Sequence, residues 1–314
     1  MLGRIALAWS ATFVGMTIDQ RILVSGVSGP IGKALLPELR KRGHVIRLVR
    51  GRVMGNDEIS WNPAQALPPE QVAGFDVVIH LAGETIVGRW NAAKKARIRD
   101  TRVQGTKTLV EALTKTAHPP RAFICASAIG YYGDRGDEIL REESAPGNDF
   151  LAQVCREWET ATQRATNAGI RTVNTRFGVI LSRDGGALPK MLPPFRMGVG
   201  GRIGNGRQWM SWVHIADVVG AIEHALDNPS VTGPVNVVGP NPAMNAEFTR
   251  TLARALHRPA IFPMPAFAAR LAFGEMGDAL LLASQRVEPA KLVESGYQFR
   301  FPRLESALEN ILRS

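Results

Sequence analysis

The chain has few of the residues that build disulfide frameworks and metal centres. Its 314 residues include two cysteines, Cys125 and Cys155, and no CxxC motif. Two cysteines are too few for a disulfide framework and are typical of a reducing compartment, so we expect a cytoplasmic protein. The six histidines are spread singly, without the HExxH spacing of a zinc site, and no metal site is predicted.

Long apolar runs are also missing. No stretch is long enough to span a membrane, and we expect no membrane partner. The first 19 residues hold an apolar patch with one arginine, but Ser10 and Thr12 interrupt it. A start at Met16 would give the usual short lead into a first strand. We therefore interpret residues 1–15 as an extension that packs poorly and lies outside the fold, with an export signal as the alternative.

Charge is unbalanced, with 38 Lys and Arg against 28 Asp and Glu, a net charge of +10 and a pI of about 10.2. The basic residues are scattered, and no nucleic-acid fold signature or aromatic interleaving accompanies them, so no nucleic-acid partner is expected. The densest group lies in and just before one predicted helix and comprises Arg89, Lys94, Lys95, Arg97, Arg99 and Arg102. A polyanionic dinucleotide is the simpler partner for this group, and a solvated helix face is the alternative.

Residues 21–50 form the most informative stretch. Arg21–Ser25 is a short apolar run typical of a buried parallel strand. Lys33–Arg42 has helical spacing of apolar residues and ends at Gly43, and Val45–Val49 is a second apolar run. The order strand, glycine-rich turn, helix, strand is the context that turns a glycine pattern into a dinucleotide-binding prediction.

The turn itself reads GVSGPIG, with glycines at Gly26, Gly29 and Gly32. The first glycine permits a tight exit from the strand, the second lets the backbone approach a pyrophosphate, and the third lets the helix pack close to the sheet. The first helical turn then presents free N–H groups to the phosphates. The predicted phosphate-binding residues are Gly26, Ser28, Gly29, Pro30, Ile31 and Gly32.

The end of the second strand predicts which dinucleotide is bound. An NAD site usually has an acidic residue there, which holds the ribose 2′-hydroxyl. Here Val49 is followed by Arg50, with Arg47 on the same strand and Arg52 just beyond. Because a guanidinium suits a 2′-phosphate, we expect NADP(H) rather than NAD(H). The alternative is that Arg50 is only a solvated charge at the end of a strand.

The next part of the chain alternates strands and helices. Asp76–Ala82 is a buried strand followed by Gly83 and Glu84, so Leu81, Ala82, Gly83 and Glu84 are predicted to lie against the cofactor. The further expected elements are a helix at Ala92–Lys115, a strand at Arg121–Ser127, a helix at Phe150–Thr166 and a strand at Arg171–Phe177. This alternation predicts an α/β fold with a doubly wound parallel Rossmann sheet.

The pattern changes after residue 178. Glycine and proline punctuate short segments, among which we expect a helix ending at Leu226, a strand at Pro234–Val238 and a helix at Asn245–Leu256 capped by Asn245. We expect residues 1–19 to be an extension, 20–178 to form the NADP(H)-binding domain, and 179–314 to form a smaller C-terminal substrate-side lobe with one or two crossings back to the sheet.

Several long motifs resemble one family, the atypical extended short-chain dehydrogenases/reductases called epimerase family proteins, which are similar to NAD-dependent epimerases and dehydratases. They are GVSGPIG, HLAGE followed by GRW, SAIGYYGDRGDE, DFLAQVCREWE, the stretch from GGALPKML to WVHIADV, and SQRVEPAKLVESGYQF. The resemblance covers about residues 20–312. It implies a Rossmann fold, NADP(H) binding, a small C-terminal domain and a poorly defined reaction.

The chain departs from the wider superfamily at the residues that carry its chemistry. Members of that superfamily use a Tyr-x-x-x-Lys pair at the start of the helix after SAIGYYG, where the lysine lowers the pKa of the tyrosine. Here Leu151 and Cys155 stand at those two positions, and Arg102 stands where the preceding helix usually has an asparagine. Standard ketone reduction or sugar epimerisation is therefore in doubt.

Other groups remain near the expected nicotinamide position. Ser127 ends the predicted strand and keeps a hydroxyl, and Tyr132 follows in the loop, so both are candidate catalytic residues. Glu159 lies on the helical face of Leu151 and Cys155, so we place it at the site, with Arg102 pairing with it or with the cofactor. The alternatives are that Tyr132 is a packed loop aromatic and Glu159 a surface carboxylate.

Two functions follow from these features. One is an NADP(H)-dependent oxidoreductase or isomerase of an unidentified small carbonyl or hydroxyl substrate. The other is a non-catalytic NADP(H)-binding redox sensor or scaffold, favoured by the missing tyrosine and lysine. We expect a monomer or a homodimer.

Overall fold

A computed structural model describes residues 19–313 of the chain. Residues 1–15 and the expectations placed on them lie outside the described residues. Within residues 19–313, no helix combines the length and the apolar character needed to cross a bilayer.

A seven-stranded sheet in which every neighbouring pair is parallel forms the centre of the molecule, in the order β11-β7-β5-β4-β1-β2-β3. Its strands are β1 (Gln20–Ser25), β2 (Gly43–Val49), β3 (Glu58–Ser60), β4 (Val77–His80), β5 (Ala122–Ala128), β7 (Arg171–Phe177) and β11 (Gly233–Val237). The doubly wound sheet predicted from the sequence is confirmed. Its strand order reverses between β1 and β4, which is where open α/β sheets bind ligands.

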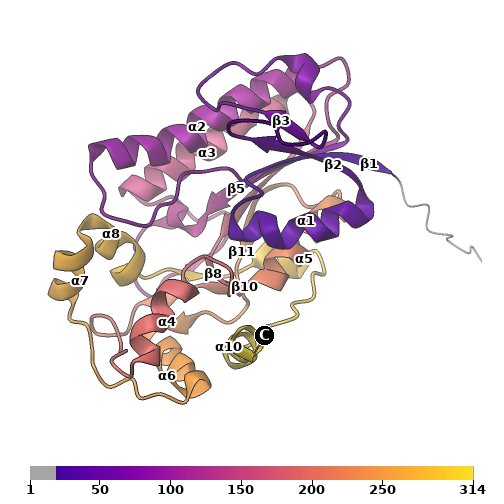
Figure 1. The fold of residues 1–314 in the computed structure, drawn as a ribbon. Coiled ribbons are helices and arrows are strands. Elements are labelled where there is room, and N and C mark those ends of the chain that lie inside the picture. The colour runs from indigo at the N-terminus through magenta and orange to yellow at the C-terminus, as the bar shows by residue number, and fades with distance from the viewer. Residues whose placement is uncertain (1–18, 314) are drawn as a thin grey trace, which may run out of the picture.

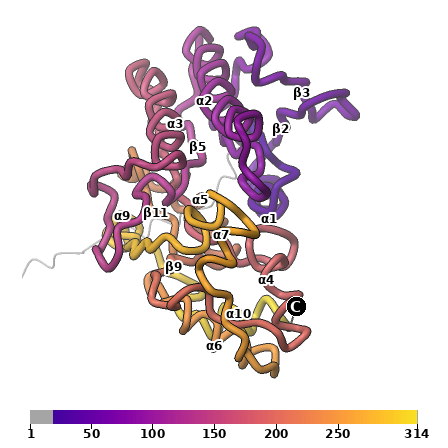
Figure 2. The backbone as a smooth tube through the Cα atoms, turned by 90° about the vertical axis from the view of Figure 1, so that its left-hand side faces the viewer, coloured from indigo at the N-terminus to yellow at the C-terminus, as the bar shows by residue number. Residues whose placement is uncertain are grey.

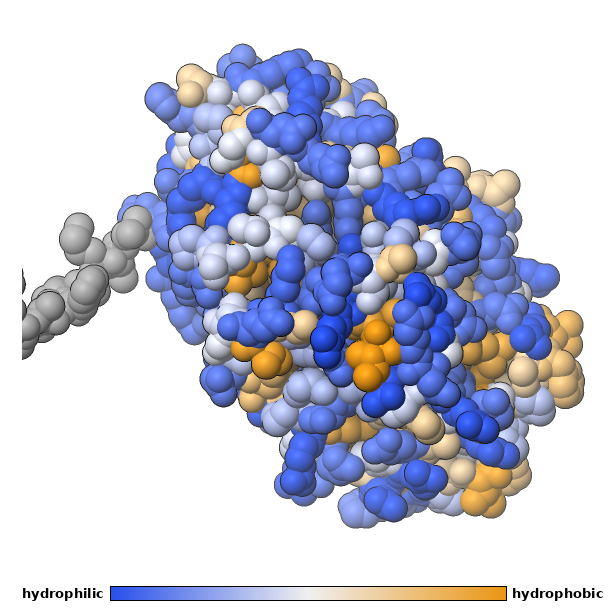
Figure 3. Space-filling model, turned by 180° about the vertical axis from the view of Figure 1, so that it is seen from behind, coloured by the Kyte–Doolittle hydropathy of each residue, from blue (hydrophilic) through white to orange (hydrophobic). Residues whose placement is uncertain are grey.

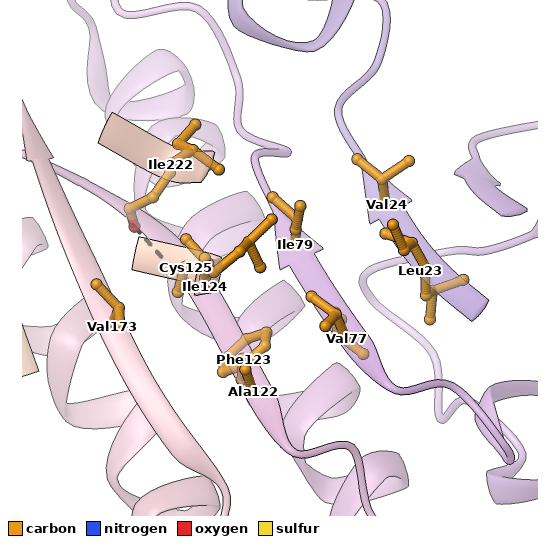
Figure 4. Packing of buried hydrophobic residues seen from close by; sticks show 14 of the residues in the cluster. Leu23, Val24, Val77, Ile79, Ala122, Phe123, Ile124, Cys125, Val173 and Ile222 are labelled. Atoms are coloured by element: carbon orange, nitrogen blue, oxygen red, sulfur yellow. Dashed lines mark hydrogen bonds between the residues drawn. The ribbon is translucent and has the colours of Figure 1, made fainter. Parts of the chain in front are cut away.

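The strands owe their burial to continuous apolar runs. In register, Leu23 of β1 lies beside Val78 of β4, and Ile124 of β5 lies beside Val173 of β7. Figure 4 shows Leu23, Ile124 and Val173 among the apolar side chains that pack along the strands of the sheet. Residues such as Leu23, Phe123 and Val173 are fully buried, as expected for a sheet covered on both faces.

Helices cover both faces of the sheet (Figures 1 and 2). α2 (Ala92–Thr114) and α3 (Phe150–Asn167) pack together on one face, and α1 (Pro30–Arg42) and α5 (Ile215–Asp227) pack together on the other. Arg42 of α1 reaches Asp227 of α5 with hydrogen bonds of 2.6 and 2.7 Å. The helix ends match the sequence predictions within a few residues, because each helix has a clear apolar period and a polar cap or glycine at its end.

A smaller lobe follows at the carboxyl ends of the strands and has its own apolar core. Leu192, Phe248, Leu252 and Leu308 belong to this core and come from three helices. The helices of the lobe are α4 (Leu188–Arg196), α6 (Asn245–Leu256), α7 (Ala266–Phe273), α8 (Glu275–Gly277) and α10 (Leu304–Arg313). The remaining elements are short: β6 (Ile139–Leu140), β8 (Val179–Leu181), β9 (Trp209–Met210), β10 (Trp212–His214), β12 (Ala243–Met244), β13 (Arg286–Val287), α9 (Ala290–Glu294), and single turns at Pro69–Val72, Ile129–Tyr132 and Asp278–Leu282.

The chain crosses back to the sheet after residue 178, because α5 and β11 complete the Rossmann unit. A buried carboxylate ties the C-terminal segment to this crossing. Asp217 of α5 accepts hydrogen bonds from the backbone N–H of Arg300 at 2.7 Å and of Phe301 at 2.9 Å, and from the hydroxyl of Tyr297 at 3.1 Å.

The prediction that Asn245 caps α6 was wrong. The N-cap position is Met244, and the Asn245 side chain instead accepts a hydrogen bond of 2.8 Å from the backbone N–H of Ile203. Asn245 is buried, and a tertiary partner on a neighbouring loop has displaced the local capping bond.

Candidate cofactor site and buried polar network

Two glycines of the first turn are required by close backbone contacts. Gly26 has φ +76°, and a Cβ there would lie 2.5 Å from the carbonyl carbon of Leu81. A Cβ on Gly32 would lie 2.4 Å from Cα of Val27, so this glycine lets α1 pack against the turn. A Cβ on Gly29 would meet only the Gly26 carbonyl oxygen, at 3.3 Å, so the fold does not require glycine there.

The turn leads directly into the N-terminus of α1. Gly29 is the N-cap and Pro30 the first helical residue, so the missing N–H of the proline costs no helical hydrogen bond. The N–H groups of Ile31 and Gly32 lie in the first turn, where the helix supplies no carbonyl partner, and Ser28 is exposed beside them. Such a terminus attracts phosphate groups.

A buried clip holds the end of β4 beside this turn. The Ser25 hydroxyl is 2.7 Å from Nδ1 of His80 and accepts a hydrogen bond of 3.2 Å from the N–H of Leu81. His80 is fully buried, and burial lowers its pKa to about 4. The clip positions Leu81 and Ala82 against Gly26. Their predicted contact with the cofactor stays a prediction.

Arg50 lies exposed immediately after β2, which ends at the half-buried Val49. Arg50 forms no hydrogen bond or ion pair with any residue that the structure describes. Arg47, on the same strand, differs: its guanidinium is 3.0 Å from both Asp57 and Glu58. Arg50 is therefore available to a ligand, whereas Arg47 is engaged within the fold.

Glu84 reaches the same edge of the sheet from the loop after β4. Its carboxylate forms an ion pair of 2.6 Å with Lys94. The hydrogen bond and charge of Lys94, and the charges of Arg97 and Arg50, hold the pKa of Glu84 below its usual range. The structure thus brings together Arg50 and Glu84, which lie 34 positions apart in the chain.

Arg102 supports the loop that carries Glu84. Its guanidinium donates to the Glu84 carbonyl oxygen at 2.9 Å and to that of Ile98 at 3.1 Å, and lies 5.1 Å from the centre of the Trp158 ring. A Cβ on Gly83 would lie 3.1 Å from the guanidinium carbon, so the loop and Arg102 are in close contact. Burial lowers the pKa of Arg102.

Glu159 pairs with a residue that the sequence analysis did not single out. Arg176 of β7 donates from Nε to one carboxylate oxygen and from a terminal nitrogen to the other, each at 2.8 Å. The Ser127 hydroxyl donates to the same carboxylate at 2.7 Å. Burial opposes the charge on Arg176, but the hydrogen bonds and charge of Glu159 outweigh it and raise the pKa of Arg176.

The two neighbouring tyrosines have different environments. Tyr132 is fully buried; its hydroxyl donates to Asn236 at 2.7 Å and accepts from Arg176 at 2.9 Å, and burial raises its pKa to about 12. This placement favours the packing interpretation of Tyr132. Tyr131 is half-buried, and its ring centre is 3.5 Å from the guanidinium carbon of Arg176. Tyr131 thus lies on the outer side of the network.

The two positions of the missing Tyr-x-x-x-Lys pair are filled by packing groups. A Cβ on Gly130 would be 3.3 Å from Cβ of Leu151 and 4.0 Å from Sγ of Cys155, so both side chains pack beneath the loop after β5. Both are buried, and burial raises the pKa of Cys155 to about 12. Neither group transfers protons near neutral pH. In the described part of the chain, no cluster of three or more His, Cys, Asp or Glu is arranged to hold a metal.

The chain belongs to the NAD dependent epimerase/dehydratase family, whose model matches residues 22–239. Residues 264–311 match a second model, a domain of unknown function called DUF1731. Both matches agree with the Rossmann unit and the small lobe described above.

Its relatives span nearly the whole chain. An epimerase family protein of Mycobacterium bovis is 41% identical over 290 residues, which is 91% of this chain and 96% of that protein. Mouse epimerase family protein SDR39U1 is 40% identical over 297 residues, 93% of this chain and 99% of the relative. A crystal structure of human SDR39U1 with NADPH superposes with a TM-score of 0.86 at 36% identity and covers 94% of this chain and 99% of that one.

Proposed function

We propose that this protein binds NADP(H) at the carboxyl ends of β1, β2 and β4. The observation that carries the proposal is Arg50, an exposed guanidinium that forms no hydrogen bond or ion pair within residues 19–313 and stands at the position where NAD-binding sheets have a carboxylate. The crystal structure of human SDR39U1 with NADPH supports the proposal, because that protein is similar over nearly its whole length.

Each part of the dinucleotide has residues that suit it. The turn from Gly26 to Gly32 would hold the pyrophosphate on backbone N–H groups. Arg50 would bind the 2′-phosphate, and the loop at Gly83 and Glu84, supported by Arg102, would lie along the adenosine ribose. When bound, NADP(H) supplies or accepts a hydride.

We further propose an oxidoreductase or isomerase of a small carbonyl or hydroxyl compound that works without the usual tyrosine and lysine. The polar groups at the carboxyl end of β5 support this proposal. Ser127 and Glu159 share a hydrogen bond, and Arg176 holds the carboxylate in a fixed orientation. Such a network keeps polar groups preorganised beside the site, although Ser127 itself is only 2% exposed.

A non-catalytic NADP(H) sensor or scaffold is the second candidate. Two observations favour it: Leu151 and Cys155 fill the positions of the proton-transfer pair, and the hydroxyls of Ser127 and Tyr132 are taken by internal partners. A cytoplasmic location fits both proposals, because both cysteines are free and buried.

Binding and turnover are tested separately. Calorimetric titration with NADPH tests the site, and wild-type protein that does not bind NADPH would overturn both proposals. Turnover is then followed by NADPH absorbance against panels of small aldehydes and ketones, and by NADP⁺ reduction with alcohols. Turnover that is lost in Glu159→Gln but kept in Glu157→Gln, a control on the same helix whose carboxylate pairs with Arg99, supports the enzyme. Tight NADPH binding without turnover on any panel favours the sensor.

A further inference from the structure

The loop between α6 and α7, together with α7 itself, carries an unusual amount of exposed apolar surface. Ile261 is 71% exposed, Phe267 72% and Leu271 80%, and Phe262 is more than half exposed. We call these four residues the apolar edge. Figure 1 shows the connection running along the outer boundary of the small lobe, and Figure 3, from behind, shows orange surface at the corresponding edge on the right.

The outward face of α7 differs from its inward face. Phe267 and Leu271 lie one turn apart and therefore share a face, whereas Ala269 is fully buried on the other side. The following residues secure the inward side, where Glu275 forms an ion pair with Lys95 and the Gly88 N–H donates to the sulfur of Met276 at 3.2 Å. The exposed phenylalanine and leucine make no contribution to this anchoring.

A basic hollow adjoins one end of the apolar edge, at Ile261. A surface hollow of about 560 Å³ at the C-terminal end of α6 is lined by Arg250, Arg254, His257 and Arg258, with Ala253 and Ala260. Ile261 and Phe262 follow Ala260 directly in the chain. No ion-pair partner for these three arginines lies within residues 19–313. The acidic residue of α6, Glu247, lies in the first turn at the opposite end of the helix.

This combination of groups matches an anionic bilayer. Protruding aromatic and aliphatic side chains enter the boundary between headgroups and acyl chains, while arginines beside them meet anionic headgroups. The apolar side chains are largely exposed, whereas a partner helix docks its apolar face into a groove that buries such residues. A second copy docked symmetrically by the same surface would bring its arginines towards those of the first.

We propose that the apolar edge and the basic hollow form a peripheral docking surface for a membrane that contains anionic lipid. The sequence analysis expected no membrane partner because no run spans a bilayer, and a peripheral surface needs no spanning run. The surface lies on the small lobe, away from the glycine turn, so docking and NADP(H) binding involve different residues.

The test is cosedimentation of the full chain with vesicles. One set contains phosphatidylcholine only, and the other contains phosphatidylcholine with about a third phosphatidylglycerol. The wild type is expected to pellet with the anionic vesicles only, and less at high salt. F267S/L271S should weaken binding more than tenfold, since each side chain loses its apolar transfer energy. R254Q/R258Q should weaken it about fivefold for each arginine removed.

Two control variants change exposed residues elsewhere. Val293→Ser removes an exposed apolar side chain on α9, and Arg156→Gln removes an exposed arginine on α3. Both should bind vesicles like the wild type, and all variants should keep the wild-type melting temperature and NADPH affinity.

Wild-type protein that stays in the supernatant with anionic vesicles, or that binds both vesicle types equally, would overturn the proposal. So would a wild-type dimer in light scattering that F267S/L271S converts to a monomer, since the surface would then be a self-contact. Free inorganic phosphate should not compete at millimolar concentration; full competition would identify a simple anion site.

Discussion

The carboxylate of Glu159 and the guanidinium of Arg176 form a bidentate ion pair, in which both hydrogen bonds are 2.8 Å long. The arginine side chain is 2% exposed and the glutamate side chain 13% exposed. Arg176 also donates to the Tyr132 hydroxyl and to the Glu142 carbonyl oxygen at 3.0 Å. A single buried cation therefore connects α3, β7 and the loops that follow β5.

Removing one partner of this pair should be strongly destabilising. Glu159→Ala leaves the Arg176 charge buried without its counter-ion, which typically costs about 3–5 kcal/mol. Glu159→Gln keeps the size and one acceptor oxygen and should cost less. The measurement is the free energy of unfolding from urea titration. Glu157→Ala, which breaks a more exposed pair with Arg99, serves as the control and should cost less than about 1 kcal/mol. If Glu159→Ala lowers the free energy of unfolding by no more than this control does, the Glu159–Arg176 pair is well solvated.

The two tyrosines after β5 should respond differently to loss of the hydroxyl. Tyr132→Phe leaves the buried side-chain oxygen of Asn236 without its donor, which should cost about 1–3 kcal/mol. Tyr131→Phe should leave the free energy of unfolding nearly unchanged, because its stacking on Arg176 depends on the ring. Chemical denaturation of both variants checks this, and equal losses would contradict the different environments described for them.

Cofactor preference should depend on Arg50. NADPH and NADH differ only by the 2′-phosphate, and a hydrogen bond to a charged group contributes roughly 1.5–3 kcal/mol. NADPH should therefore bind roughly ten- to a hundredfold more tightly than NADH. Arg50→Ala should remove most of that preference and leave NADH affinity nearly unchanged, and Arg50→Asp should reverse it.

Calorimetric titration of both cofactors decides the matter. Arg156→Ala, at an exposed position on α3, is the control and should keep the wild-type preference. The preference should also weaken as salt rises, because Arg50 is exposed. A preference that survives Arg50→Ala intact would show that other groups read the 2′-phosphate.

Acid should weaken the fold through His80. Its pKa is about 4 in the folded protein, against 6.5 for an unperturbed histidine, because burial opposes the charged form. Between these values the unfolded chain binds more protons, so stability falls as pH drops from about 6.5 towards 4, by up to about 3 kcal/mol.

Free energies of unfolding at pH 7 and pH 4.5 test this expectation. His80→Phe cannot take up the proton, so its loss between the two pH values should be smaller than that of the wild type. The exposed His118→Gln should behave like the wild type. If His80→Phe and the wild type lose the same free energy of unfolding between pH 7 and pH 4.5, the buried imidazole is not the cause of the acid destabilisation.

The fold and the cofactor turn were accessible from the sequence because their signals are local. Gly26 and Gly32 are required by contacts within the first strand–helix unit and with Leu81, and strands β1, β4 and β5 contain continuous apolar runs. The short strand at Glu58–Ser60 was missed, since three residues next to β2 carry no period of their own. α4 was missed because its prolines are typical of loops, although two of them lie inside the helix.

The polar network was accessible only in part. Ser127 and Glu159 were correctly placed near each other by strand end and helical spacing, but their common partner was not foreseen. Arg176 lies in a strand that was predicted without a role for its side chain. Asn236, which accepts the hydrogen bond of Tyr132, is 104 residues away in the chain. Such partners are determined by the order of strands in the sheet and leave no local signature. The same reason explains why Glu159, one of the two partners considered for Arg102, pairs with Arg176 instead.

The pairing of β6 with β13 sets an order of events during synthesis. The segment after β5 takes several of its hydrogen bonds from residues near 285. The Gln285 side chain donates to the carbonyl oxygens of Ile129 at 3.2 Å and Gly133 at 3.1 Å, and the backbone N–H of Glu288 donates to the carbonyl oxygen of Leu140 at 2.9 Å. Ile129 and Gln285 are separated by 156 positions, which a ribosome needs roughly ten to thirty seconds to cover. The close contacts of Gly26 and Gly32 involve residues no later than Ala82, so these residues are all synthesised while the loop after β5 is still without its partners near residue 285. A nascent chain that stalls within this interval would expose the loop after β5 without these partners. The protease sensitivity of that loop, followed over time, should fall once the segment around Gln285 has been synthesised and has bound to it.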